Sequence, residues 1–160
     1  MTRRPGRLTS LIALLLLLSR QASLGADWYV STNGAHTTFD SWAAAATNIQ
    51  AALNAAGPDD TVSVSNGTYF IAPELMVTNR VILQGVNGRE VTILQRPVTA
   101  TNRILQIAAA AGGAVVSGFT LRSGYIAASG LGGGGYMVTG LLQNCTITNC
   151  STPVNGNYVG

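Results

Sequence analysis

Apolar residues between positions 40 and 58 recur at steps of three and four, which is the spacing of one face of an α-helix. This face comprises Trp42, Ala45, Ala46, Ile49, Ala52, Leu53 and Ala56. Asp40, Ser41 or Thr47 can cap the start of the helix, and Gly57 followed by Pro58 supplies its end. We expect one short amphipathic helix here, either continuous or broken near Thr47.

Beyond Pro58 the pattern changes from helical to alternating. Short runs rich in β-branched and other apolar residues occupy positions 61–64, 68–71, 81–84, 91–94, 104–107, 115–121 and 141–148. Glycine or asparagine separates most of these runs, at 66–67, 85, 87–88, 112–113 and 130–135. We therefore expect an all-β fold, with many short strands and almost no helix after residue 58.

An internal repeat bears on the choice between two all-β architectures, a hairpin-built sandwich and a solenoid of stacked coils. The segment VSGFTL at 116–121 aligns with LQNCTI at 142–147, so that position 116 corresponds to position 142. Because side chains alternate along a strand, each segment places two apolar residues on one face: Phe119 with Leu121, and Cys145 with Ile147. A period of roughly 20 to 50 residues is typical of repeat architectures, so the repeat favours the solenoid.

Several longer segments carry a resemblance to a known group of proteins. The stretches TNIQAALNAA (47–56), DDTV (59–62) and NGTY (66–69) stand at the entry to the β-rich region. The stretches VILQGVNG (81–88), VSGFTL (116–121) and NCTITN (144–149) follow within it. The first three resemble the N-terminal entry, and the last three the coil repeats, of secreted bacterial right-handed parallel β-helix proteins of the pectin-lyase-like superfamily. The resemblance covers most of the chain and is more specific for fold than for activity.

The resemblance implies a right-handed parallel β-helix, a solenoid, with a short N-terminal capping helix. The first coil of a solenoid exposes an apolar cross-section, and the face with Ile49, Leu53 and Ala56 is available to cover it. We expect a signal peptide at 1–25, an N-terminal strand and capping helix at 26–57, and the first coils of the β-helix at 58–160. Few coils are present and no closing element is visible before Gly160, so we expect the solenoid to be truncated at its C-terminus.

Residues 1–25 have the order of a secretory signal peptide. A basic start is followed by an apolar run at 11–18 and by the small residues Ser23 and Gly25 on either side of Leu24. A membrane-spanning helix needs about 20 apolar residues, and this run is broken at 19–21. We expect a cleaved signal, no transmembrane segment after cleavage, and a secreted protein, extracellular or at the cell surface. An uncleaved anchor is the alternative.

The charge balance disfavours a nucleic-acid partner. The 160-residue chain is 47% hydrophobic and 9% charged, with a formal net charge of +3. Four of the nine Arg lie within positions 1–25, which leaves five Arg against six Asp and Glu. Because the rest of the chain has no Lys and no basic run to neutralise phosphates, we expect no nucleic-acid binding.

The sequence motifs lead us to expect no cofactor and no metal. GLGGGG at 130–135 matches the glycine spacing of a dinucleotide fingerprint, but a strand-like run follows where that motif requires a helix. Cys145 and Cys150 stand five positions apart in a segment expected to be extended, too far for a disulfide and on opposite faces. We expect Cys145 to be a small buried apolar residue. Two cysteines with the distant His36 do not make a four-ligand zinc site.

We also expect no catalytic residue in this chain. Glycoside hydrolysis uses two carboxylates that face the scissile bond, whereas the adjacent Asp59 and Asp60 lie where aspartate normally forms turns. Polysaccharide lyases of the superfamily use acidic calcium ligands with a basic residue, and Arg96, Arg103 and Arg122 have no acidic neighbours in sequence. The other titratable residues have simpler explanations: a helix cap for Asp40, isolated positions for Glu74 and Glu90, and a solvated loop for His36.

Two hypotheses for the function remain open. The first is a structural β-helix segment that serves as a scaffold for binding carbohydrate or for adhesion, with a polysaccharide or cell-surface glycan as partner. The second is the N-terminal portion of a polysaccharide lyase or glycoside hydrolase whose active site lies beyond residue 160. The first is favoured, because the site residues are missing and a fold alone does not assign chemistry. In either case an open strand edge would allow self-association.

The signal pattern predicts where the exported chain begins. Because Ser23 and Gly25 supply the small residues that signal peptidases require, the mature protein should start at Ala26 or Asp27. Intact-mass measurement of the exported protein checks this, and a mass that includes Met1 would contradict it.

Overall fold

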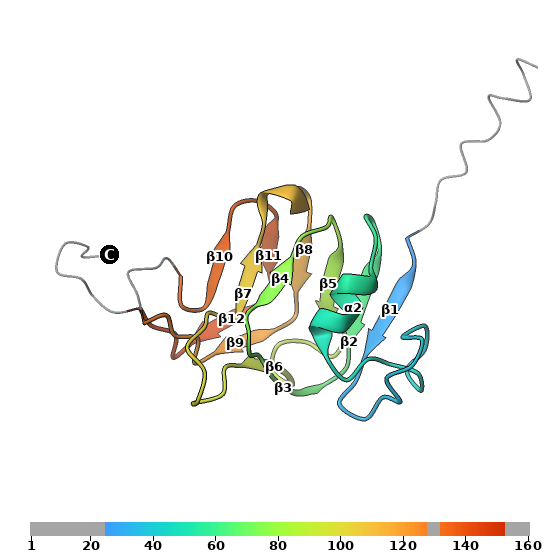
Figure 1. Cartoon of the computed structure of the whole chain (residues 1–160), viewed down its shortest axis with the longest axis horizontal. Helices are drawn as coiled ribbons and strands as arrows, with labels where there is room; N and C mark the ends of the chain where they lie inside the picture. The colour runs from blue at the N-terminus through green and yellow to red at the C-terminus, as the bar shows by residue number, and fades with distance from the viewer. Residues whose placement is uncertain (1–24, 128–131, 153–160) are drawn as a thin grey trace, which may run out of the picture.

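The computed structural model describes residues 25–127 and 132–152, which form an all-β architecture of short strands (Figure 1). The first strand, β1 (Asp27–Val30), precedes the α-helix α2 (Ile49–Ala55). The next strands are β2 (Thr61–Val64), β3 (Gly67–Phe70), β4 (Leu75–Val77), β5 (Ile82–Gly85), β6 (Thr92–Gln95) and β7 (Leu105–Ile107). After the 3₁₀ helix η1 (Ala109–Ala111) come β8 (Val115–Ser117), β9 (Thr120–Arg122), β10 (Gly135–Met137), β11 (Leu141–Gln143) and β12 (Thr146–Thr148).

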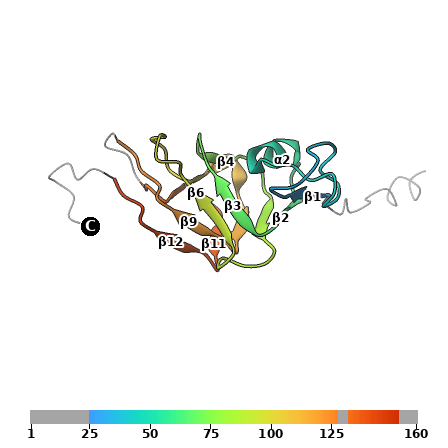
Figure 2. The same cartoon turned by 90° about the horizontal axis from the view of Figure 1, so that it is seen from below.

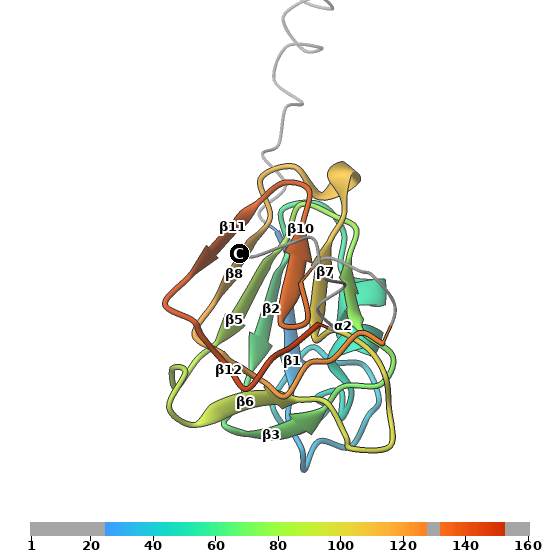
Figure 3. The same ribbon diagram turned by 90° about the vertical axis from the view of Figure 1, so that its left-hand side faces the viewer.

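These strands pair in parallel and form three sheets. Sheet A has the order β1-β2-β5-β8-β11, sheet B the order β3-β6-β9-β12, and sheet C the order β4-β7-β10. The chain visits the sheets in a fixed order, because β2, β3 and β4 form a first triplet, followed by β5, β6 and β7 and then by β8, β9 and β10. Each strand therefore lies beside its counterpart in the preceding triplet, at about 4.8 Å, and the three sheets surround a common interior (Figure 3).

The interior between the sheets is apolar, and its side chains stack in rows from one triplet to the next. In sheet B, Tyr69, Leu94 and Leu121 occupy equivalent positions and are 5%, 0% and 0% exposed. The next member of this row, Ile147, is 53% exposed. It lies in β12, which is the edge strand of sheet B within the described residues, so no strand there covers it.

Strand register confirms the internal repeat that the sequence predicts. Leu142 lies opposite Val116 in sheet A, and Ile147 lies opposite Leu121 in sheet B. The predicted shared face is confirmed for Phe119 and Leu121, both of which are fully buried. The repeat length varies elsewhere. Ile82 lies opposite Thr61 on one side and opposite Val115 on the other. The segment of chain from Ile82 to Val115 is therefore much longer than the segment from Thr61 to Ile82.

Two runs that the sequence predicts as single strands are each divided by a corner. The run at 115–121 turns at Gly118 (φ +77°), and the run at 141–148 turns at Asn144 (φ +50°). Glycine, and to a lesser degree asparagine, tolerates this left-handed conformation. Each corner therefore passes the chain from sheet A to sheet B, and the residue after it, Phe119 or Cys145, packs against the core.

The helix is shorter than the apolar periodicity predicts. It begins after Asn48, whose side-chain oxygen accepts hydrogen bonds from the N–H groups of Gln50 (2.8 Å) and Ala51 (3.3 Å). The expected caps Asp40, Ser41 and Thr47 do not take this role, because residues 40–44 form bends and turns and Ala46 forms a β-bridge with Val30 before the helix begins. Trp42 accordingly leaves the predicted buried face: it is 44% exposed and its ring lies 4.7 Å from that of Tyr29, edge to face.

Helix α2 lies over the N-terminal end of the interior, as Figure 1 shows. Ile49, Leu53 and Ala56 are buried in the common core cluster, as the predicted apolar face requires. The side chain of Gln50 adds a polar contact to β4, the edge strand of sheet C. Its amide oxygen accepts from the N–H of Met76 (2.8 Å), and its amide nitrogen donates to the carbonyl of Met76 (3.1 Å). One side chain thus satisfies the backbone as a neighbouring strand would.

Thr92 offers a test of core packing. Its side chain is fully buried and its hydroxyl has no hydrogen-bond partner among the described residues. The substitution T92V keeps the shape and removes the unpaired hydroxyl, so the free energy of unfolding should rise by about 1 kcal/mol. Urea denaturation measures this, with T92S as the control that keeps the hydroxyl and loses a methyl group. A T92V protein less stable than the parent would show that the hydroxyl is hydrogen-bonded.

Candidate functional site

The two adjacent aspartates at the start of the β-rich region serve different structural purposes. Asp60 is 9% exposed and accepts three hydrogen bonds, from the N–H groups of Ala26 (2.7 Å) and Gly57 (2.8 Å) and from the indole of Trp28 (2.8 Å). Burial alone would raise the pKa of Asp60, but these hydrogen bonds outweigh it and hold the pKa below its usual value. Asp59 instead forms an exposed ion pair with Arg80. The two carboxylates therefore do not face a common substrate position.

The two glutamates also pair with arginines. Glu74, which the sequence leaves isolated, lies 2.6 Å from Arg103 in a largely buried ion pair, and the Arg103 guanidinium lies 5.2 Å from the ring centre of Tyr136. Glu90 pairs with its neighbour Arg89 at 3.2 Å. Across residues 25–127 and 132–152, no three His, Cys, Asp or Glu side chains converge as metal ligands would.

Asp40 and His36 belong to the loop that precedes the helix. Asp40 accepts a hydrogen bond from the hydroxyl of Thr38 (2.7 Å), so the sequence prediction of a helix cap at Asp40 is wrong. His36 is exposed, as a loop position implies, and its Nδ1 accepts from the N–H of Thr47 (3.0 Å). Both side chains stabilise turns of this loop.

The two cysteines are free thiols at the last described strand of sheet B. Cys145 is half-buried against the core, and burial raises the pKa of its thiol, which disfavours the reactive thiolate. The segment from Cys145 to Cys150 is not fully extended, because Asn149 adopts a positive φ of +52° and turns the chain after β12. The prediction that the two side chains occupy opposite faces of one extended segment therefore does not apply.

The glycine-rich segment leads into a strand. Of residues 130–135, positions 132–135 lie within the described residues, and Gly135 begins β10 where a dinucleotide fingerprint would require a helix. A side chain at Gly133 would place its Cβ 2.4 Å from the carbonyl oxygen of Ser151, so this glycine permits close approach of two backbones. Close packing of the two backbones therefore explains why position 133 is a glycine.

Partly exposed cationic, polar and aromatic side chains lie at the ends of β6 and β9 in sheet B and just beyond them, and we call this group the arginine face: Gln95, Arg96, Arg122 and Tyr125. Figure 2 shows β3, β6, β9 and β12 side by side in this sheet. Gln95 and Arg122 are register partners on β6 and β9, and the Arg122 guanidinium donates to the Gln95 side-chain oxygen, with its Nε at 3.0 Å. Stacking thus places side chains from two successive triplets in direct contact.

Arg96 is fixed beside this pair by backbone oxygens. Its Nε donates to the carbonyl of Ser123 (2.6 Å), and its terminal nitrogen donates to the carbonyls of Pro97 and Ala100. The guanidinium also lies 5.7 Å from the ring centre of Tyr125. Arg96 is therefore held in one place by neutral acceptors and an aromatic ring.

Neither cation of the arginine face is neutralised within the described residues. The ion pairs found there involve Arg80, Arg89 and Arg103, each with its own carboxylate. Arg96 and Arg122 bind only neutral oxygens, so their positive charges are uncompensated. Because a guanidinium presents a planar fork of donors, this arrangement suits a ligand with carboxylate or sulfate groups.

Searches against protein-family models, curated proteins and solved structures found no match. The function is therefore inferred from the arrangement of the side chains. None of the helices in the described ranges has the length and apolar character needed to cross a bilayer. The sequence indicates no partners for Arg96 and Arg122, because each contacts a residue of a neighbouring triplet that is distant in the sequence.

The hydrogen bonds to Asp60 predict an acid-sensitive stability. A carboxyl whose pKa is lower in the folded than in the unfolded state, about 3.9 when unfolded, stabilises the fold above that value. This contribution is lost as the pH falls through the folded pKa. The free energy of unfolding should therefore decrease below about pH 5, and D60N should weaken that dependence and cost roughly 1 to 3 kcal/mol at neutral pH.

The matched control is D59N, which removes the neighbouring carboxylate from an exposed ion pair and should cost no more than about 1 kcal/mol. Urea denaturation of the three proteins between pH 2 and 7, roughly the range of carboxyl titration, measures both effects. If D60N and the parent lose stability equally as the pH falls, Asp60 is not the group responsible.

Proposed function

We propose that this protein is a right-handed parallel β-helix of the pectin-lyase-like type that acts as an extracellular or cell-surface scaffold and binds acidic carbohydrate through its arginine face. The fold proposal is supported by the recurrence of three parallel sheets in a fixed order along the chain. It is also supported by the helix that covers one end of the stack. The location outside the cytoplasm rests on the signal pattern of residues 1–25.

The observation that carries the binding proposal is the pair of guanidinium groups, Arg96 and Arg122, without carboxylate partners in the described residues. Both are ordered by hydrogen bonds before any ligand arrives, so little side-chain entropy would be lost on binding. The amide nitrogen of Gln95 and the ring of Tyr125 stand beside them. Guanidinium and amide donors fit the carboxylates and hydroxyls of a sugar chain, and the aromatic ring offers an apolar surface for a pyranose.

The spacing of the sheet supports an extended polymer as ligand. Outward side chains at one register position repeat on successive strands at about 4.8 Å, and this row runs from Phe70 on β3 through Gln95 and Arg122 to Thr148 on β12. A polysaccharide laid across the strands would meet one side chain per strand, an exposed aromatic ring on β3 and polar groups on the next three strands. A small isolated anion would use only one of them.

The experiment compares binding of the purified protein to alginate, an acidic polysaccharide, and to dextran, a neutral one, by affinity electrophoresis and calorimetry. R122Q should weaken alginate binding by about tenfold or more, because it removes a charge-assisted hydrogen bond. Binding to dextran should be weak for every variant. Added salt should weaken alginate binding, since the contact is ionic and exposed.

R89Q is the matched control, because it removes the same charge from a position that Glu90 already neutralises. It should change alginate binding by less than about threefold, in line with the small energies of exposed ion pairs. Thermal unfolding of each variant verifies that the fold is retained. Equal losses in R89Q and R122Q would mean that net charge alone attracts the polymer, and absence of alginate binding by the parent would refute the proposed function.

A further inference from the structure

The three sheets differ in what bonds to the edge strand at the N-terminal end of each. In sheet A, β1 pairs with β2 and extends the sheet by one strand. In sheet C, the Gln50 side chain satisfies the N–H and carbonyl of Met76 on the edge strand β4. In sheet B, β3 is the edge strand, and no described strand pairs with its outer side.

The outer side of β3 presents a regular set of backbone groups. On its inner side, the N–H groups of Gly67 and Ile71 donate to the carbonyls of Val91 and Gln95, each at 2.8 Å. In a parallel ladder, alternate residues direct both N–H and carbonyl to the same side. Thr68 and Phe70 therefore direct theirs away from β6, toward the open edge.

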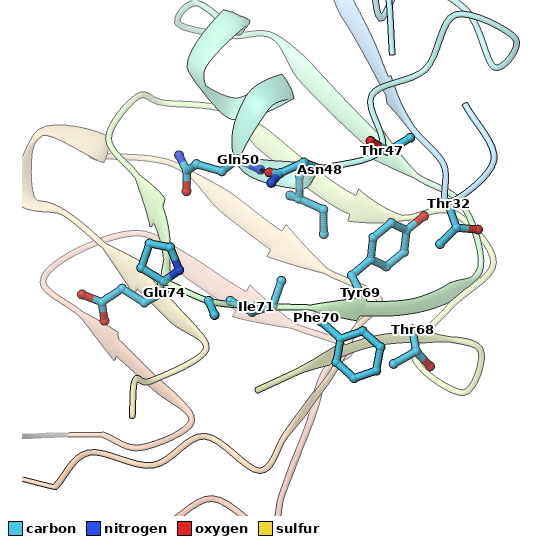
Figure 4. A pocket seen from close by; sticks show the side chains of 12 residues that line it. Thr32, Thr47, Asn48, Gln50, Thr68, Tyr69, Phe70, Ile71 and Glu74 are labelled. Atoms are coloured by element: carbon cyan, nitrogen blue, oxygen red, sulfur yellow. Dashed lines mark hydrogen bonds between the residues drawn. The ribbon is translucent and has the colours of Figure 1, made fainter. Parts of the chain in front are cut away.

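A cavity of about 260 Å³ lies along this edge. Its floor is formed by the buried side chains of Ile49, Tyr69 and Ile71. Its far wall comes from the loop before α2 and includes Thr32 and Thr47 (Figure 4). In the same figure, the Tyr69 hydroxyl points toward Thr32, while the Phe70 ring points away from the helix. The cavity is thus a slot between a strand edge and a second segment of the chain.

We propose that this slot is a strand-addition site, in which an extended segment of another polypeptide pairs with β3 as the missing neighbour in sheet B. Unpaired strand edges are templates for such pairing, and the exposed backbone supplies affinity that does not depend on side chains. This inference uses the backbone at the outer edge of β3, whereas glycan binding uses outward side chains. The Phe70 side chain stands next to Gln95 in the outward row of sheet B, so alginate binding is measured for F70P and F70V alongside peptide binding.

The slot also defines the chemistry of its partner. Glu74 is the one charged residue in the described lining, and Arg103 neutralises it, so an uncharged segment fits best. Alternate side chains would point to the apolar floor and to the solvent side next to Phe70. Pairing of this edge with the sheet edge of a second copy of the chain is the competing outcome of the test.

A suitable probe is a labelled peptide with the sequence VTILQ, residues 91–95, because β6 already pairs with β3 in this sequence. The control peptide carries N-methyl groups at alternate residues, which removes the donors on one side without changing the side chains. Fluorescence anisotropy measures binding to the purified protein. Amide hydrogen exchange measured by NMR then locates the contact at single residues.

The decisive variant is F70P, which removes the N–H that faces the slot and leaves the β3 bonds to β6 in place, as an edge strand permits. F70V is the matched control that keeps this N–H. Peptide affinity should fall about tenfold in F70P relative to F70V, the effect of one lost backbone hydrogen bond. T47W, which fills the slot from the opposite wall without altering β3, tests the same proposal should F70P fail to fold.

Strand addition predicts saturable binding of VTILQ and much weaker binding of the N-methylated peptide. It also predicts slower exchange at the amides of Thr68 and Phe70, with Tyr69 unchanged because its N–H already faces β6. The proposal is overturned if VTILQ does not bind saturably, if the N-methylated peptide binds equally well, or if T47W binds like the parent. It is also overturned if light scattering shows that the protein closes this edge by dimerisation.

Discussion

Each strand in a parallel stack depends on the strands on both sides of it for its backbone hydrogen bonds. Inside the stack this condition is met by repetition, since β5 lies between β2 and β8 and β6 lies between β3 and β9. At the end of the stack it has to be met in another way. Here a further strand, β1, closes one sheet, and the side chain of Gln50 closes another. The segment before β2 is therefore an integral part of the sheet structure.

Much of the local structure could be predicted from the sequence. The apolar face at Ile49, Leu53 and Ala56, most of the strand runs and the repeat between 116–121 and 142–147 agree with the structure. The corners at Gly118 and Asn144 could not be predicted, because an apolar residue follows each of them and the apolar pattern of the run therefore looks continuous. The steps between equivalent positions of successive triplets differ in length, so most of the repeat is hidden from alignment. The three-residue strand β4 is too short to give a periodic signal.

The candidate site could be predicted only in part, for a related reason. Arg122 and Gln95 are far apart in the sequence, yet their side chains are in contact. Arg103 and Glu74 are separated by a similar stretch of chain and form an ion pair. Stacking brings residues that are one repeat apart in the sequence into direct contact. Because the length of the repeat varies, no fixed sequence spacing identifies such pairs. The neighbours Asp59 and Asp60 show the opposite relation, because they bind different parts of the molecule and share no site.

The hydrogen bond from the Ala26 N–H to Asp60 would have a consequence for the protein if the signal pattern is cleaved directly before Ala26. A peptidase that cuts between Gly25 and Ala26 turns this amide into the terminal ammonium group of the protein. A positive charge would then stand 2.7 Å from a carboxylate that is 9% exposed, and the hydrogen bond would become an ion pair between the exposed terminus and this carboxylate. Cleavage and folding would reinforce each other, because the new terminus is anchored at the junction of β1 and β2, where the stack begins.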